Sequence, residues 1–174
     1  MMKDARRKKS EASTNLCVLD FEASGLDNAS YPIEVAVWLR GDVHSWLIHP
    51  EQDWNYWCET AESMHGITRQ MLIELGKPAA VVAEELNSVL NSVNVVYSDA
   101  ANWDDFWLQR LYVAAKVKPG FAIASVFSLL NENQREMFLL QRDMLVSSGV
   151  YRHHRAGEDV KLIRQALMAA LESL

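Results

Sequence analysis

Two acidic residues, Asp20 and Glu22, close an apolar run in the segment LCVLDFEASGL, residues 16–26. The run at residues 16–19 is typical of a central strand covered on both faces. Side chains alternate along a strand, so Asp20 and Glu22 point to the same side of the sheet. Two like charges at a buried strand end repel each other and lose hydration unless a cation joins them. The alternative is a strand end that reaches solvent, where acids need no partner.

Two further acids and a histidine extend this pair. Asp104 follows a short apolar strand at residues 93–98, and Asp159 lies five residues after His154 in the segment HRAGED. Carboxylate oxygens suit hard cations such as Mg²⁺, and two such ions can stabilise both the attacking and the leaving oxygens of an in-line displacement. A histidine of near-neutral pKa can take the proton from the attacking water. The set is what two-metal phosphodiester hydrolysis requires.

The elements that must position these groups follow from the apolar patterns. Strands are expected at residues 33–40 and 43–49, joined by a tight hairpin at Gly41-Asp42, and again at 93–98 and 121–124. Helices are expected at residues 78–91, around Trp103–Ala114, within 125–145 and at 157–174. A loop rich in Trp and Tyr lies between the hairpin and the first helix. This order predicts an α/β fold with a mixed five-stranded sheet, antiparallel in its first three strands and then parallel, flanked by helices.

Composition bounds the class of protein. The chain has 174 residues, 49% hydrophobic content and a formal net charge of -6. Residues 1–14 are expected to form a flexible basic tail, and residues 15–174 a single domain. Two cysteines, Cys17 and Cys58, are too few for a disulfide scaffold, so reduced thiols are expected. With no secretory signal or membrane-spanning run visible, the prediction is a soluble, cytoplasmic protein without a membrane partner.

Four motifs occur in a fixed order along the chain: LDFEASGL, MHGIT, NWDDFWL and HRAGED. Each is common by chance when taken singly, but the series is specific. Together they resemble the motifs of the DEDDh 3′–5′ exonucleases, the family of the DNA polymerase proofreading subunit, RNase T and the three-prime repair exonucleases. The resemblance covers roughly residues 16–174. It implies a ribonuclease H-like fold and metal-dependent release of nucleoside monophosphates from the 3′ end of single-stranded DNA or RNA.

The resemblance also implies roles for the acidic residues and the histidine. Asp20, Glu22 and Asp159 correspond to direct ligands of the first of two divalent metal ions, with Asp20 bridging to the second. Asp104 corresponds to the remaining acid, acting on the metal through water, and His154 to the general base. The metals would be Mg²⁺ or Mn²⁺, both of which suit carboxylates.

Residues around the first two motifs correspond to the site at which the family binds the terminal nucleotide. The backbone of Ala23, Ser24 and Gly25 would contact it, and Leu26 would wedge against its base. The second wall would be formed by His65 and Gly66. Arg155, inside the last motif, is a candidate phosphate partner.

Three positions depart from the family pattern or are ambiguous. Where the family has His-Asn, this chain has Ser98-Asp99, so Asp99 is either an extra acid near the site or a turn-capping residue. Asp104 is preferred over Asp105 because Trp107 and Leu108 then match the apolar pair that follows the family's acid. His154 is preferred over His153 because it has an aspartate five residues later. Glu34 is expected to form a structural hydrogen bond or to be exposed.

Other questions stay open at the level of sequence. Trp54, Tyr56 and Trp57 either cover a sheet edge or an oligomer contact, or stack on unpaired bases. The substrate can be DNA, RNA or very short oligonucleotides, and a homodimer is left open because some relatives dimerise. The alternative function is a catalytically inactive module of the same fold that binds nucleic acid or a protein partner.

Overall fold

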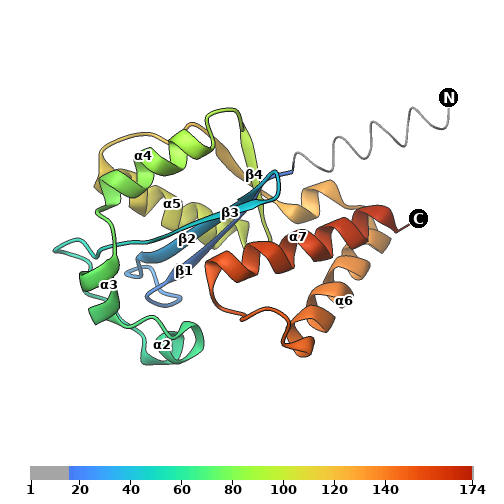
Figure 1. The fold of residues 1–174 in the computed structure, drawn as a ribbon, viewed down its shortest axis with the longest axis horizontal. Helices are drawn as coiled ribbons and strands as arrows, with labels where there is room; N and C mark the ends of the chain where they lie inside the picture. Colours follow the sequence, from blue (N-terminus) through green and yellow to red (C-terminus); the bar gives the residue numbers. More distant parts are fainter. Residues whose placement is uncertain (1–15, 174) are drawn as a thin grey trace.

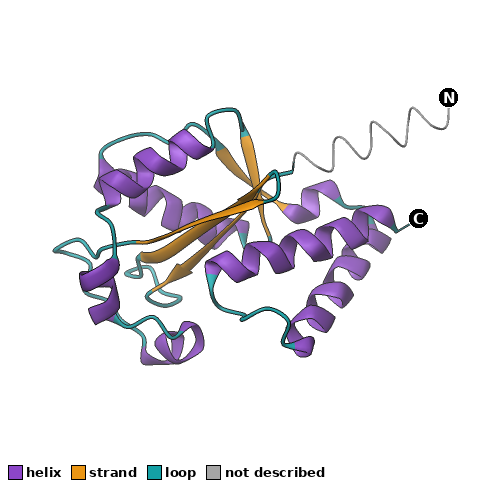
Figure 2. Ribbon diagram, in the orientation of Figure 1, coloured by secondary structure: helices purple, strands orange, loops and turns teal. Residues whose placement is uncertain are grey.

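The computed structural model describes residues 16–173, in which a five-stranded sheet lies between two layers of helices (Figures 1 and 2). The strand order is β3-β2-β1-β4-β5. Their bounds are Val18–Ala23 (β1), Pro32–Leu39 (β2), Asp42–Leu47 (β3), Val95–Ser98 (β4) and Ala122–Ser125 (β5). The basic tail expected at residues 1–14 lies outside the described residues.

The sheet is mixed, as the order of elements predicted. β1, β2 and β3 pair antiparallel, whereas β4 pairs parallel with both β1 and β5. The hairpin between β2 and β3 turns at Arg40-Gly41, one residue earlier than expected, because Asp42 already pairs with Leu39. Both turn residues have positive φ, 53° and 104°, which is the conformation that two-residue hairpins favour.

Helices cover both faces of the sheet. Their bounds are Glu59–His65 (α2), Arg69–Leu75 (α3), Ala79–Val89 (α4), Ala101–Ala115 (α5), Glu132–Ser148 (α6) and Ala156–Glu172 (α7), with a 3₁₀ turn at Val126–Leu129. Strand alternation divides the core between the faces: Leu19 packs in the cluster with Leu86 of α4 and Leu111 of α5, whereas its neighbour Val18 packs with Val160 of α7. β1 is therefore the buried strand that its apolar sequence predicted.

Three expectations about local structure were incomplete or wrong. β1 continues beyond residue 19 through both acids to Ala23. The helices α2 and α3 occupy a region from which no helix was predicted, since both are only seven residues long and bury one residue each. The helical stretch at 125–145 is broken at Leu130-Asn131, where Asn131 forms a capping box with Gln134 at the start of α6.

Among the described helices, none is both long and apolar enough to cross a lipid bilayer. Both cysteines are free: Cys17 is buried in the core and Cys58 is half-buried.

Candidate functional site

Three predicted metal ligands meet at the carboxyl end of β1. Asp20 and Glu22 of β1 and Asp159 of α7 each offer a carboxylate oxygen, and these atoms all lie within 4.8 Å of one another. The strand pairing holds the first two in place, since Asp20 is opposite Ala36 and Glu22 opposite Glu34 of β2. The 1,3 spacing on a buried strand thus produces the shared orientation expected from alternation.

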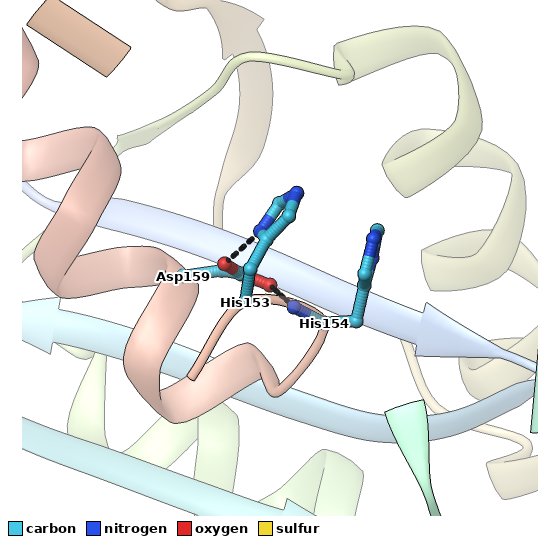
Figure 3. Close-up of side chains that lie close together, drawn as sticks. All are labelled: His153, His154 and Asp159. Atoms are coloured by element: carbon cyan, nitrogen blue, oxygen red, sulfur yellow. Dashed lines mark hydrogen bonds and ion pairs between the residues drawn. The ribbon is translucent and has the colours of Figure 1, made fainter. Parts of the chain in front are cut away.

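Asp159 is held by the loop that precedes α7. Its Oδ2 accepts a hydrogen bond from the His154 backbone N–H at 2.8 Å, and its Oδ1 lies 2.7 Å from Nδ1 of His153 (Figure 3). The two histidine rings are neighbours, with centroids 3.9 Å apart and planes tilted by 30°, and His154 has a positive φ of 64°. This conformation lets the loop wrap one carboxylate while carrying both imidazoles on the same side.

The fourth acid, Asp104, is almost fully buried in the first turn of α5. The hydroxyl of Ser98, at the end of β4, donates a short hydrogen bond to Asp104 Oδ2 and accepts one from the Ala100 backbone N–H. Asp105 is exposed, so the helix presents Asp104 rather than Asp105 to the interior. Asp104 is not part of the three-residue group within 4.8 Å.

Burial and mutual repulsion dominate the electrostatics of these acids. Burial, and then the charges of Asp104 and Glu22, raise the pKa of Asp20 well above its usual value. Burial and Asp159 raise the pKa of Glu22 to about 9, and burial raises that of Asp104 to about 8 in spite of the hydrogen bond from Ser98. A divalent cation would remove the repulsion that causes these shifts.

The acids lie in a pocket of about 670 Å³. Its lining includes Ala23, Gly25, Leu26 and His65 from the predicted nucleotide grip, together with both histidines of the loop before α7. Leu26 is 72% exposed, so its side chain is available for contact with a ligand. The lining of the pocket therefore combines acidic and apolar side chains.

The other predicted substrate residues have structural contacts. Ser24 closes the turn after β1 through hydrogen bonds with Tyr31, and Gly66 ends α2 in a left-handed conformation. Arg155 forms an ion pair with Glu34, at 2.8 Å, and does not line the pocket. Of the two alternatives for Glu34, a structural hydrogen bond or exposure, the structure shows the first.

Several lining residues were not identified as site residues from the sequence. Tyr56 comes from the aromatic loop, whereas Trp54 of the same loop is buried and stacks on Tyr31 at 5.2 Å between ring centroids. Trp103 lines the pocket beside Asp104 and stacks on Trp107 at 5.4 Å. Arg142 of α6 reaches the pocket and pairs with Asp99. The sequence signal for Trp103 was its place next to an acid, whereas Arg142 lies in no motif.

No protein-family model matches the chain, and no curated protein matches it. Its structure is similar to that of E. coli exonuclease I in complex with a dT13 oligonucleotide (16% identity, TM-score 0.69), covering 90% of this chain and 40% of that one. The chain has the ribonuclease H-like fold.

Other solved exonuclease I structures are similar to this chain to the same extent. Exonuclease I from Methylocaldum szegediense is 18% identical, with a TM-score of 0.64, and the match covers 90% of this chain and 39% of that one. A zinc-bound form of the E. coli exonuclease I–ssDNA complex is 14% identical, with a TM-score of 0.66 and coverage of 90% and 40%. The chain thus spans about two-fifths of the exonuclease I chains that it matches, and at these identities the ribonuclease H-like fold is what they share.

The donor set fits divalent metal ions. The three clustered carboxylates supply only oxygen atoms, the preferred ligands of Mg²⁺ and Mn²⁺. Their charges repel one another in a poorly solvated place, and a bound cation would stabilise them. A second group within 4.8 Å, formed by His153, His154 and Asp159, overlaps the first at Asp159.

Proposed function

We propose that the chain is a metal-dependent 3′–5′ exonuclease of the DEDDh type, which releases nucleoside monophosphates from single-stranded ends. The observation that carries the proposal is the convergence of Asp20, Glu22 and Asp159 within 4.8 Å in the lining of a pocket. The fold shared with exonuclease I, whose structures include oligonucleotide complexes, supports the same reaction. A cytoplasmic location and a homodimer stay predictions.

The acidic residues are assigned to two divalent metal ions. Asp20, Glu22 and Asp159 would hold the first, Asp20 would also contact the second, and Asp104 would act through water. Bound there, the ions would supply positive charge to the attacking and leaving oxygens of the phosphodiester. Ser98 positions Asp104 by its hydrogen bond, which keeps the buried carboxylate from turning away.

His154 is assigned as the general base. It lines the pocket, and burial together with His153 lowers the pKa of its imidazole below the ordinary 6.5. The ring is therefore neutral at pH 7 and can accept the proton of the attacking water. The backbone hydrogen bond from His154 to Asp159 ties the base to a metal ligand.

The terminal nucleotide is assigned to the wall formed by α2 and the turn after β1. Leu26 offers an exposed apolar surface to a base. His65 Nδ1 accepts a hydrogen bond from the Ile67 backbone N–H at 3.0 Å, so its proton is on Nε2. That nitrogen is buried without a hydrogen-bond partner among the described residues, and we assign it to a substrate oxygen.

The test is a time course with 3′- and 5′-labelled single-stranded DNA and RNA, each with Mg²⁺, Mn²⁺ or EDTA. Shortening from the 3′ end that EDTA stops is expected, and the faster substrate identifies the sugar. Asp20→Ala should abolish the reaction and His154→Ala should slow it by about 10²- to 10⁴-fold. In both variants the circular dichroism spectrum should be unchanged. Binding without turnover of any substrate would instead favour an inactive binding module.

A further inference from the structure

Among the residues that the structure describes, one permanently positive side chain lines the pocket. Among the described residues that line it, acids outnumber bases, and Arg142 is the one arginine or lysine. Nucleic acid carries a negative charge on every phosphate, so a binding groove normally offers arginine or lysine to the backbone. Metal ions bound at the acids would serve the phosphate at the cleaved bond, which leaves the neighbouring phosphates to other groups.

Arg142 is held loosely by its carboxylate neighbours. Its Nη1 lies 3.4 Å from Asp99 Oδ2, and its Nη2 lies 3.6 Å from Asp143 Oδ1, beyond hydrogen-bond distance. The side chain is 35% exposed. An arginine has five N–H donors, and in the described residues Arg142 uses one of them in a hydrogen bond. The remaining fork can bind a phosphate through two parallel hydrogen bonds.

The position of Arg142 indicates which phosphate it meets. The assigned grip on the terminal nucleotide comes from α2 and the turn after β1, with Leu26 and His65 in the lining. Arg142 and Val146 enter the same lining from α6, a helix that lies apart from α2 (Figure 1). Suppose that the last nucleotide of a nucleic acid lies at α2 and its cleaved bond at the acids. The rest of the nucleic acid, on the 5′ side of that bond, then continues toward α6.

We propose that Arg142 binds the phosphate one nucleotide 5′ of the cleaved bond and so makes the enzyme prefer substrates that carry this second phosphate. The proposal rests on the exonuclease function proposed above. Asp99, which replaces the asparagine of the family pattern, orients the guanidinium toward the pocket in the absence of substrate. A simple charge pair between the two residues is the alternative that the experiment must exclude.

The experiment compares two dinucleotides, dTpdT and pdTpdT, which differ only in the 5′ phosphate. The wild-type kcat/KM is expected to favour pdTpdT by roughly 10-fold, as for a charge-assisted hydrogen bond. Arg142→Gln should bring this ratio close to one. Arg142→Lys should keep part of it, because lysine supplies the charge without the fork. Arg135→Gln removes the same charge from α6 outside the pocket and is the matched control, expected to keep the full ratio.

A double-mutant cycle separates phosphate binding from charge pairing. If Arg142 binds the phosphate, Arg142→Gln lowers the ratio in both the wild-type and the Asp99→Asn background. The proposal would be overturned if Arg142→Gln no longer lowered the ratio in the Asp99→Asn background. It would also be overturned if Arg142→Gln lowered kcat/KM equally on both dinucleotides.

Calorimetric titration of each dinucleotide in Ca²⁺, with product analysis to verify that it stays intact, measures the same preference without turnover. A wild-type protein that cleaves neither dinucleotide and also fails to shorten the labelled single-stranded DNA and RNA would refute the proposed function. Equal dissociation constants for the two in wild type would refute the role of Arg142.

Discussion

Glu34 on β2 and Arg155 at the start of α7 form a two-pronged ion pair across 121 residues of sequence, with N–O distances of 3.1 and 2.8 Å. The same carboxylate accepts the backbone N–H of Ala156 at 2.9 Å, so a strand residue caps the helix. Glu34 is only 4% exposed. Since Asp159 lies in the first turn of α7, this contact sets where a predicted metal ligand meets β1.

We predict that Glu34→Gln lowers the free energy of unfolding by about 2–3 kcal/mol, because it leaves the Arg155 charge without its partner in a largely buried position. Urea unfolding at pH 7 measures the change. Glu158→Gln breaks the more exposed pair with Lys161 in the same helix and should cost less than about 0.5 kcal/mol. Equal losses in the two variants would contradict a special role for Glu34.

The metal-free protein should lose stability as the pH rises from about 5 to about 9. The pKa values of Glu22 and Asp104 are raised in the fold, to about 9 and about 8, so between the unfolded and folded pKa values the folded state binds more protons. Raising the pH through this window removes those protons and leaves repelling charges in the native state. Thermal unfolding in EDTA across the window measures the slope, and Mg²⁺ should reduce it.

Glu22→Gln tests the origin of that slope. It removes one shifted group, which accounts for at most ~1.4 kcal/mol per pH unit. Asp105→Asn removes an exposed carboxylate next to the site and should leave the slope as it is. A slope that is the same in Glu22→Gln and in wild type would show that Glu22 does not contribute to it.

The sequence predicted the five strands and their mixed pairing because apolar runs, a hairpin turn and the alternation of strands with helices are visible along the chain. Alternate residues of β1 pack against opposite helix layers, which requires the apolar run seen in its sequence. Asp20 and Glu22 are the charged exceptions in that run. The short helices α2 and α3 escaped prediction because each has two turns and almost no buried stripe. Their existence depends on tertiary contacts, such as those of His65 and Leu72, which no periodicity encodes.

The acidic site could be predicted because its members lie in motifs, but the contacts that support it could not. Arg155 was a candidate phosphate partner, and in the structure it pairs with Glu34, a long-range contact that sequence spacing does not reveal. Asp99 was expected to cap a turn or to act as an extra acid. Its carboxylate lies in the pocket lining and is paired with Arg142, and its pKa is raised by burial.

Gly25→Ala should distort the turn that carries Leu26. A Cβ at this position would lie 2.8 Å from both Cys58 Cβ and Tyr56 Cε1, and the backbone has a φ of +148°. We expect a loss of at least about 2 kcal/mol in the free energy of unfolding, together with a higher KM. Gly149→Ala is the control for backbone strain alone, since its φ is +67° and nothing lies within 4 Å of the added Cβ. It should cost about 1 kcal/mol and leave KM unchanged.

His154→Ala should lower kcat by about 10²- to 10⁴-fold, the usual contribution of a general base, with little change in KM. In wild type the rate should fall as the pH drops through the lowered pKa of His154, because the protonated ring cannot accept a proton. The His154→Ala variant should lose this fall in rate at low pH, the acid limb of the pH–rate profile. His153 contacts the carboxylate of Asp159 and is 40% exposed, so His153→Ala should weaken metal binding but keep the acid limb. If His153→Ala removes the limb and His154→Ala keeps it, the base is His153, and the two adjacent histidines exchange the roles assigned to them here.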